Sequence, residues 1–164
     1  MTKKYPIEIY FRFYNCEDSE IQLLHEGKVC EPKNTFYIHK TELELPGNLR
    51  FEMRGKHKKK WDTQIDKDGN MLFDRYIKIV KVTVNHLMPN QLFLRKWPNV
   101  HPNSNLANFT PSNQQIHTNY IGFNGVIDLD FEGETPAKWL IKSQKYMDQG
   151  WQDDSDLHDA LFVA

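Results

Sequence analysis

An acidic turn places side-chain oxygens at every second residue, on Asp66, Asp68 and Asn70. Proteins bind calcium with carboxylate and amide oxygens, and a helix–loop–helix calcium loop begins with this spacing. The rest of that loop is missing, because Met71 stands where it needs glycine and Ile77 where it needs glutamate. An Asp-Gly-Asn sequence between strand-like segments is also typical of a hairpin turn. The sequence favours the turn and leaves a surface calcium site at Asp66, Asp68 and Asn70 as the alternative.

The sequence motifs of common enzymes are missing from the chain. The seven histidines form no His-x-His or His-x-x-x-His pair, whereas a zinc site needs several ligands that converge. There is no Gly-x-Ser-x-Gly motif and no glycine-rich phosphate loop. Acidic residues are scattered, so no pair stands out as the two carboxylates of a glycoside hydrolase. We therefore expect a protein without catalytic activity. An enzyme, such as a glycan hydrolase or a metal-dependent cupin-like protein, is the least favoured of three interpretations.

Residues 95–119 form a long segment without periodicity that contains three prolines and six asparagines. Long irregular segments inside compact domains are often functional, although this one could also be a passive connection between two sheets. Aromatic side chains in polar surroundings can stack against a sugar ring or anchor a protein interface, and we favour the interface. The predicted partner- or glycan-binding residues are Trp97, His101, Phe109, His117 and Trp151.

Alternation of apolar and polar residues predicts the elements that position these side chains. Odd-numbered residues are apolar in residues 7–13, 43–53 and 121–131, which is the pattern of strands with one buried face. The pattern changes phase within residues 76–84, which indicates a bulge or burial on both faces. Shorter predicted strands cover residues 21–24, 36–39, 61–65, 91–94 and 138–141. The prediction is a single all-β sandwich or jelly roll of about ten short antiparallel strands, with one short C-terminal helix at residues 155–163.

Composition limits the class of protein. The chain has 164 residues, 39% of them hydrophobic, and a net charge of −1. This size predicts one domain, and the charge argues against a general nucleic-acid binder. We assign residues 1–147 to the sandwich, with the loop at 95–119, and residues 148–164 to an acidic tail or short helix. No apolar run is long enough to span a membrane, and no secretion signal is recognised. A disulfide between Cys16 and Cys30, 14 positions apart, is the alternative, but without a secretion signal we favour two reduced thiols.

Several strand-and-turn motifs carry a resemblance to a known group of domains. They lie at residues 46–56, 66–70, 74–86 and 122–131, and are followed by Trp139. Together they resemble carbohydrate-binding-module-like β-sandwich domains of tailed-bacteriophage virion proteins. The resemblance covers about residues 43–141. It implies a jelly-roll fold and a virion-associated or glycan-facing role, and it carries no catalytic residues.

The functional prediction combines this resemblance with the long loop. We expect a non-enzymatic structural or adaptor component of a bacteriophage particle, in the tail, baseplate, fibre or capsid decoration. Its partners would be other virion subunits in a homo-oligomer or symmetric assembly, and it would be assembled in the host cytoplasm. The alternative is a carbohydrate-binding module for host surface glycans, assisted by calcium at Asp66, Asp68 and Asn70. No other cofactor is expected.

Overall fold

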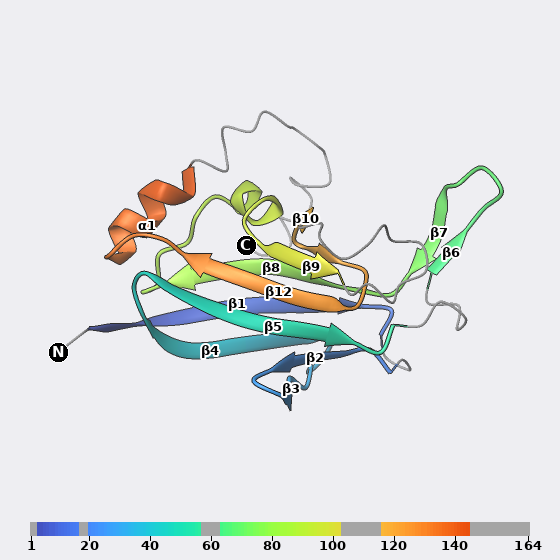
Figure 1. The fold of residues 1–164 in the computed structure, drawn as a ribbon, viewed down its shortest axis with the longest axis horizontal. Coiled ribbons are helices and arrows are strands. Elements are labelled where there is room, and N and C mark those ends of the chain that lie inside the picture. The colour runs from blue at the N-terminus through green and yellow to red at the C-terminus, as the bar shows by residue number, and fades with distance from the viewer. Residues whose placement is uncertain (1–2, 17–19, 57–62, 103–115, 145–164) are drawn as a thin grey trace.

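The structure is a computed structural model that describes residues 3–16, 20–56, 63–102 and 116–144. Two antiparallel sheets pack face to face, and a separate two-stranded hairpin projects from one end (Figure 1). This confirms the predicted all-β sandwich. Both cysteines are free thiols.

The four-stranded sheet, sheet A, has the strand order β11-β8-β1-β4. The alternation of β1 sends Ile7, Ile9, Phe11 and Phe13 into the core and leaves the even-numbered residues on the outer face. The predicted phase change in β8 is confirmed as a register shift opposite Tyr10 and Phe11. The strands of sheet A are β1 (Lys4–Tyr14), β4 (Phe36–Glu44), β8 (Tyr76–Val84) and β11 (Tyr120–Ile121).

The six-stranded sheet, sheet B, has the strand order β10-β9-β12-β5-β2-β3. Its centre is the antiparallel pair β5 and β12, in which Leu49 lies opposite Leu129 and Phe51 opposite Ile127. These four side chains are buried against sheet A. The strands of sheet B are β2 (Gln22–His25), β3 (Lys28–Val29), β5 (Gly47–Arg54), β9 (Asn99–Pro102), β10 (Ile116–His117) and β12 (Gly125–Phe131).

Two predicted strands are helices. Residues 91–94 belong to η1 (Gln91–Arg95), a short 3-10 helix whose start is capped by Asn90. Residues 138–141 belong to α1 (Pro136–Ser143). The Thr135 side chain caps α1 and Pro136 occupies its first turn; these are helix-start signals that the strand prediction overlooked. The predicted helix at residues 155–163 lies outside the described residues.

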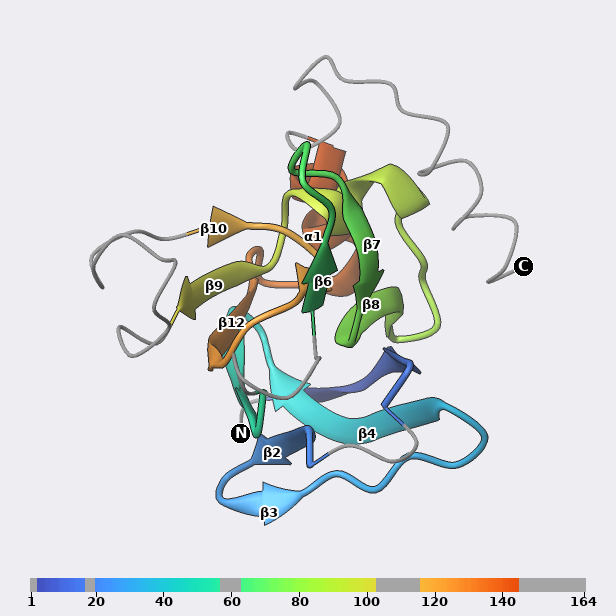
Figure 2. The same cartoon turned by 90° about the vertical axis from the view of Figure 1, so that its right-hand side faces the viewer.

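An aromatic cluster fixes η1 and α1 against the end of sheet B. Trp139 of α1 is 2% exposed, and its ring lies 6.0 Å from Phe93 of η1 and 6.2 Å from Phe131 of β12. Trp97 lies between Phe93 and Phe131 and donates a 2.7 Å hydrogen bond from its indole nitrogen to the Asp130 carbonyl. The cluster closes one end of the core, and the hairpin occupies the opposite end (Figures 1 and 2).

The projecting hairpin consists of β6 (Thr63–Ile65) and β7 (Met71–Asp74). It forms its own two-stranded sheet and stands beside the start of β8 (Figure 2). Ile65, Met71 and Leu72 are 56%, 56% and 67% exposed, so the hairpin presents apolar side chains to solvent. An isolated two-stranded hairpin is marginally stable in water. Its orientation must therefore be fixed by contacts at its base.

Candidate functional site

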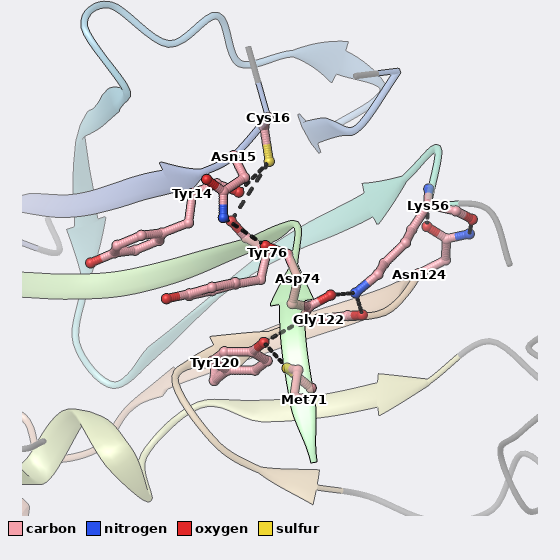
Figure 3. Close-up of polar contacts among 10 residues, drawn as sticks. All are labelled: Tyr14, Asn15, Cys16, Lys56, Met71, Asp74, Tyr76, Tyr120, Gly122 and Asn124. Carbon is pink, nitrogen blue, oxygen red and sulfur yellow. Dashed lines mark hydrogen bonds and ion pairs between the residues drawn. The ribbon is translucent and has the colours of Figure 1, made fainter. Parts of the chain in front are cut away.

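The outer face of sheet A carries a row of side chains that crosses all four strands. Tyr120 of β11 stacks on Tyr76 of β8 with ring centroids 4.1 Å apart. Tyr76 stacks on Tyr14 of β1 at 4.4 Å and an interplanar angle of only 11° (Figure 3). The Arg12 guanidinium lies 4.7 Å from the Tyr14 ring and 5.5 Å from the Phe36 ring of β4. We call these five residues the aromatic row.

The register of the strands produces the row. Tyr14 lies directly opposite Tyr76, and Arg12 lies directly opposite Phe36. Cross-strand aromatic pairs on one sheet face attract each other, and a cation over an aromatic ring adds to the attraction. The pKa of Tyr76 is raised by burial first and then by its neighbours Tyr14 and Asp74. The row therefore extends from one edge strand of sheet A to the other and presents phenol hydroxyls and one guanidinium.

A buried ion pair lies behind the Tyr120 end of the row. Lys56 Nζ lies 2.5 Å from Asp74 Oδ1, and the two side chains are 8% and 4% exposed. Lys56 also donates a hydrogen bond to the Gly122 carbonyl. The Tyr120 hydroxyl donates to Asp74 Oδ2, the second carboxylate oxygen (Figure 3). Burial, followed by the hydrogen bond to Asp74, raises the pKa of Tyr120 and keeps its phenol protonated.

Backbone geometry brings these groups together. Gly55, immediately before Lys56, has a φ of +91°, and a Cβ there would lie 2.1 Å from the Glu20 carbonyl oxygen. A Cβ on Gly122 would lie 2.7 Å from the Tyr120 ring and 3.1 Å from Asp74 Oδ2. Both positions therefore require glycine, because a side chain would collide with its neighbours.

Amide side chains hold the surrounding backbone. Asn124 accepts a 2.9 Å hydrogen bond from the Lys56 backbone nitrogen and donates a 3.0 Å bond to the Lys56 carbonyl. Asn15 donates a 2.8 Å bond to the Asp74 carbonyl. Lys56 precedes the hairpin and Asp74 ends it, so these contacts fix the base of the hairpin.

A second cluster lies at the edge of the sandwich between β2 and β4. The rings of His25 and His39 are 4.5 Å apart, and the Tyr37 hydroxyl lies 2.8 Å from His39 Nδ1. His39 Nε2 is buried without a hydrogen-bond partner. Burial, with a smaller contribution from His25, lowers the pKa of His39 to about 4. The His39 ring is therefore neutral at neutral pH.

The outer face of sheet B carries a polar network. Asp128 of β12 pairs with Arg50 at 2.8 Å and with His101 Nε2 at 3.0 Å. Next to it, Asn48 donates a 2.6 Å hydrogen bond to Asp130. Hydrogen bonding and the charge of Asp128 raise the pKa of Arg50. The network matches the expected polar, solvent-facing side of a strand.

The predicted binding residues do not form one surface among the described residues. Trp97 is 3% exposed and belongs to the core, because its ring fills the space between η1 and β12. His101 lies on β9 and pairs with Asp128, while His117 is exposed on β10. Strands β9 and β10 thus begin and end the segment that was predicted as a loop. Phe109 and Trp151 lie outside the described residues.

The predicted calcium turn is held by its own backbone. Asp66 Oδ1 accepts hydrogen bonds from the backbone nitrogens of Asp68 at 2.9 Å and Asn70 at 2.8 Å. These backbone bonds, the one from Asn70 foremost, lower the pKa of Asp66. Gly69 has a φ of +87°, as a tight turn requires. Within the described ranges, no three His, Cys, Asp or Glu side chains are grouped as a metal ion would need.

Comparison with known proteins gave two distant structural likenesses. No protein-family model and no curated protein matches the chain. One similar solved structure is the selenomethionine form of vCBM60. That structure was reported as showing that circular permutation links two families of calcium-dependent carbohydrate binding modules. It has a TM-score of 0.40 and 14% identity, and the match covers 77% of this chain and 90% of that one.

The other likeness is to vCBM60 in complex with galactobiose. Here the TM-score is 0.35 and the identity 12%, and the match covers 76% of this chain and 97% of that one.

Among the described residues, no helix has the length and apolar character needed to cross a bilayer.

The sequence reasoning missed both the aromatic row and the buried ion pair. The even positions of β1 did carry a signal, since Tyr10, Arg12 and Tyr14 occupy its outer face. These rings depart from the alternation of apolar inner and polar outer residues that is typical of a strand with one solvated face. The pairing of Lys56 with Asp74 had no signal, because it depends on how the ends of the hairpin meet the turn before β12.

Proposed function

We propose that the protein is a non-catalytic carbohydrate-binding module whose glycan-binding surface is the aromatic row. The observation that carries the proposal is the continuity of the row across the four strands of sheet A. A row of ring edges and hydroxyls that ends at the exposed Phe36 ring suits a chain of sugar rings, which offer apolar C–H faces and hydroxyls along their length.

The chemistry of each position fits a defined part in this proposal. Phe36, at the β4 end, is the most exposed ring of the row at 38%, and it offers an apolar surface for a sugar face. The inner rings are stacked on each other, so Tyr14 and Tyr76 would present their edges and hydroxyls. Arg12 can donate hydrogen bonds to sugar hydroxyls. Calcium at Asp66, Asp68 and Asn70 remains a part of the proposal that a metal titration would decide.

The test is retardation in native gels cast with polysaccharides. The panel contains a galactan, a xylan and an acidic polysaccharide, each run with calcium and with a chelator. We expect retardation by at least one polysaccharide and at least about tenfold weaker binding for Tyr76→Ala. Tyr5→Ala is the matched control, because Tyr5 lies at the far end of β1 from the row. Equal retardation of the two variants would remove the row from the proposal.

A second candidate function is binding to neighbouring protein subunits, as in the predicted phage-particle role. The observation that favours it is the exposed apolar surface of Ile65, Met71 and Leu72 on the hairpin, since such patches often mark interfaces. Light scattering of the wild type and of Leu72→Lys tests it. A discrete oligomer that Leu72→Lys dissociates would support this function, and a monomer in both cases would count against self-assembly. The placement in a virion stays a prediction.

A further inference from the structure

We propose that Lys56 and Asp74 join covalently, by an amide bond between Lys56 Nζ and Asp74 Cγ that forms without any other protein. The proposal is independent of glycan binding. It assigns a modification site to the buried pair at the base of the hairpin, where the amine and the carboxylate oxygen are 2.5 Å apart.

Burial is the first argument for this reaction. The two side chains are 8% and 4% exposed, and a buried ion pair retains a large desolvation cost. Moving one proton from the ammonium to the adjacent carboxylate oxygen, 2.5 Å away, gives a neutral amine and a neutral acid. A neutral amine is the form that can attack a carboxyl carbon.

The hydrogen bonds around the pair assign a role to each atom. The Tyr120 hydroxyl donates to Asp74 Oδ2, where negative charge develops when the amine adds to Cγ. A donor aimed at such an oxygen stabilises the transition state. Asp74 Oδ1 is the oxygen beside the amine, so it is placed to receive the protons that Nζ gives up. The Gly122 carbonyl accepts a hydrogen bond from Nζ and orients it.

The reaction balances without a co-reactant. The Nζ–Cγ bond forms and the bond between Cγ and Oδ1 breaks. Oδ1 leaves as water with two of the three hydrogens of the original ammonium group, and the third stays on the amide nitrogen. The product keeps both hydrogen bonds of the site, because the amide N–H donates to the Gly122 carbonyl and Oδ2, now the amide oxygen, accepts from Tyr120.

Positioning is the second argument. Lys56 is fixed through its backbone by Asn124 at 2.9 and 3.0 Å, and the Asp74 carbonyl is held by Asn15 at 2.8 Å. Reacting groups held in contact by a rigid frame react as if at very high concentration. The amide would join the two ends of the hairpin, because Lys56 precedes the hairpin and Asp74 ends it. Strands β6 and β7 would then both belong to a covalently closed loop.

Intact mass spectrometry of the denatured, full-length protein tests the proposal. We expect the wild type to be lighter than its sequence mass by one water, and Lys56→Arg to have its full sequence mass. Tryptic digestion should give a branched peptide that joins the segment containing Lys56 to the segment containing Asp74. Tyr120→Phe should form the bond more slowly and show a mixture of the two masses after purification.

One side reaction gives the same mass change and must be separated. Asp68 precedes Gly69, and such a pair can cyclise with loss of water. That product would persist in Lys56→Arg and would give no branched peptide. A wild type that retains its full sequence mass after prolonged incubation, or a water loss that persists in Lys56→Arg, would overturn the proposal.

Discussion

The two outer faces of the sandwich differ in the kind of side chains that they present to solvent. On sheet B, Asp128 lies between Arg50 and His101, so polar and charged groups pair across the strands. On sheet A, Tyr76 is stacked between Tyr14 and Tyr120, so rings line one end of the sheet. Solvation alone does not require aromatic rings on an outer face. In the proposed function, sheet A is the face that binds the glycan.

The largest expected effect concerns the support of the aromatic face. Lys56→Met removes the ammonium beside the buried Asp74 carboxylate, so the free energy of unfolding should fall by about 3–5 kcal/mol. Urea unfolding followed by fluorescence measures it. Lys4→Met, at the exposed start of β1, is the matched control and should be nearly neutral. A loss below about 1 kcal/mol would show that the pair does not support the hairpin and Tyr120.

The next effect concerns the row itself. Tyr76→Ala removes the ring that is stacked on both sides, and we expect a loss of about 2 kcal/mol from two aromatic contacts and their burial. Tyr76→Phe keeps both stacks and should retain most of the stability. If Tyr76→Phe were as unstable as Tyr76→Ala, the phenol hydroxyl and not the stacking would hold the row together.

A smaller, pH-dependent effect is expected at the edge between the two sheets. The pKa of His39 is lowered from 6.5 to about 4, so the folded state resists protonation of this ring. The resulting stability is present above pH 6.5 and is lost as the pH falls from 6.5 towards 4. After allowance for partial solvent screening, we expect a loss of about 1 kcal/mol.

Melting temperatures of the wild type and His39→Gln across this range measure the effect. The variant should show a shallower decline with acid, because its side chain does not titrate. The groups that face His39 are His25, Tyr37 and, through His25, Glu26. Parallel curves for the two proteins would assign the acid sensitivity to another group.

The smallest effect is expected on the polar face. Arg50→Ala breaks the 2.8 Å pair with Asp128, but the Arg50 side chain is 68% exposed. Exposed ion pairs contribute little, so we expect less than about 1 kcal/mol, and less still in high salt. Thermal unfolding at low and high salt measures it. A loss equal to that of Tyr76→Ala would remove the contrast between the two faces.

The sequence predicted most of the sandwich because its strands bury one face. The alternation of apolar residues identifies both the strand and its buried face. Examples are Ile7 and Ile9 in β1, and Ile127 and Leu129 in β12. The prediction failed at residues 138–141, where the three apolar residues after Lys138 fit a strand and a helix equally well. The cap at Thr135 and the proline after it were the deciding signals.

The candidate site was harder to predict, because it depends on register. Tyr14 and Tyr120 are far apart in sequence and meet only through Tyr76, once β1 and β11 both pair with β8. The binding site was predicted instead in the segment at residues 95–119, because that segment is rich in proline and asparagine. Its tryptophan, Trp97, is in the core, because a large aromatic ring fills the end of a sandwich as readily as it binds a partner.

The place of β12 in sheet B has a consequence for the timing of folding. This strand lies between β9 and β5 in the sheet, yet it is the last strand of the described chain to be synthesised. A growing polypeptide cannot complete sheet B from its N-terminal end onwards, because the edges of β5 and β9 stay open until β12 leaves the ribosome. A chain whose synthesis stops before residue 125 would therefore have two unpaired strand edges, which is a state prone to aggregation.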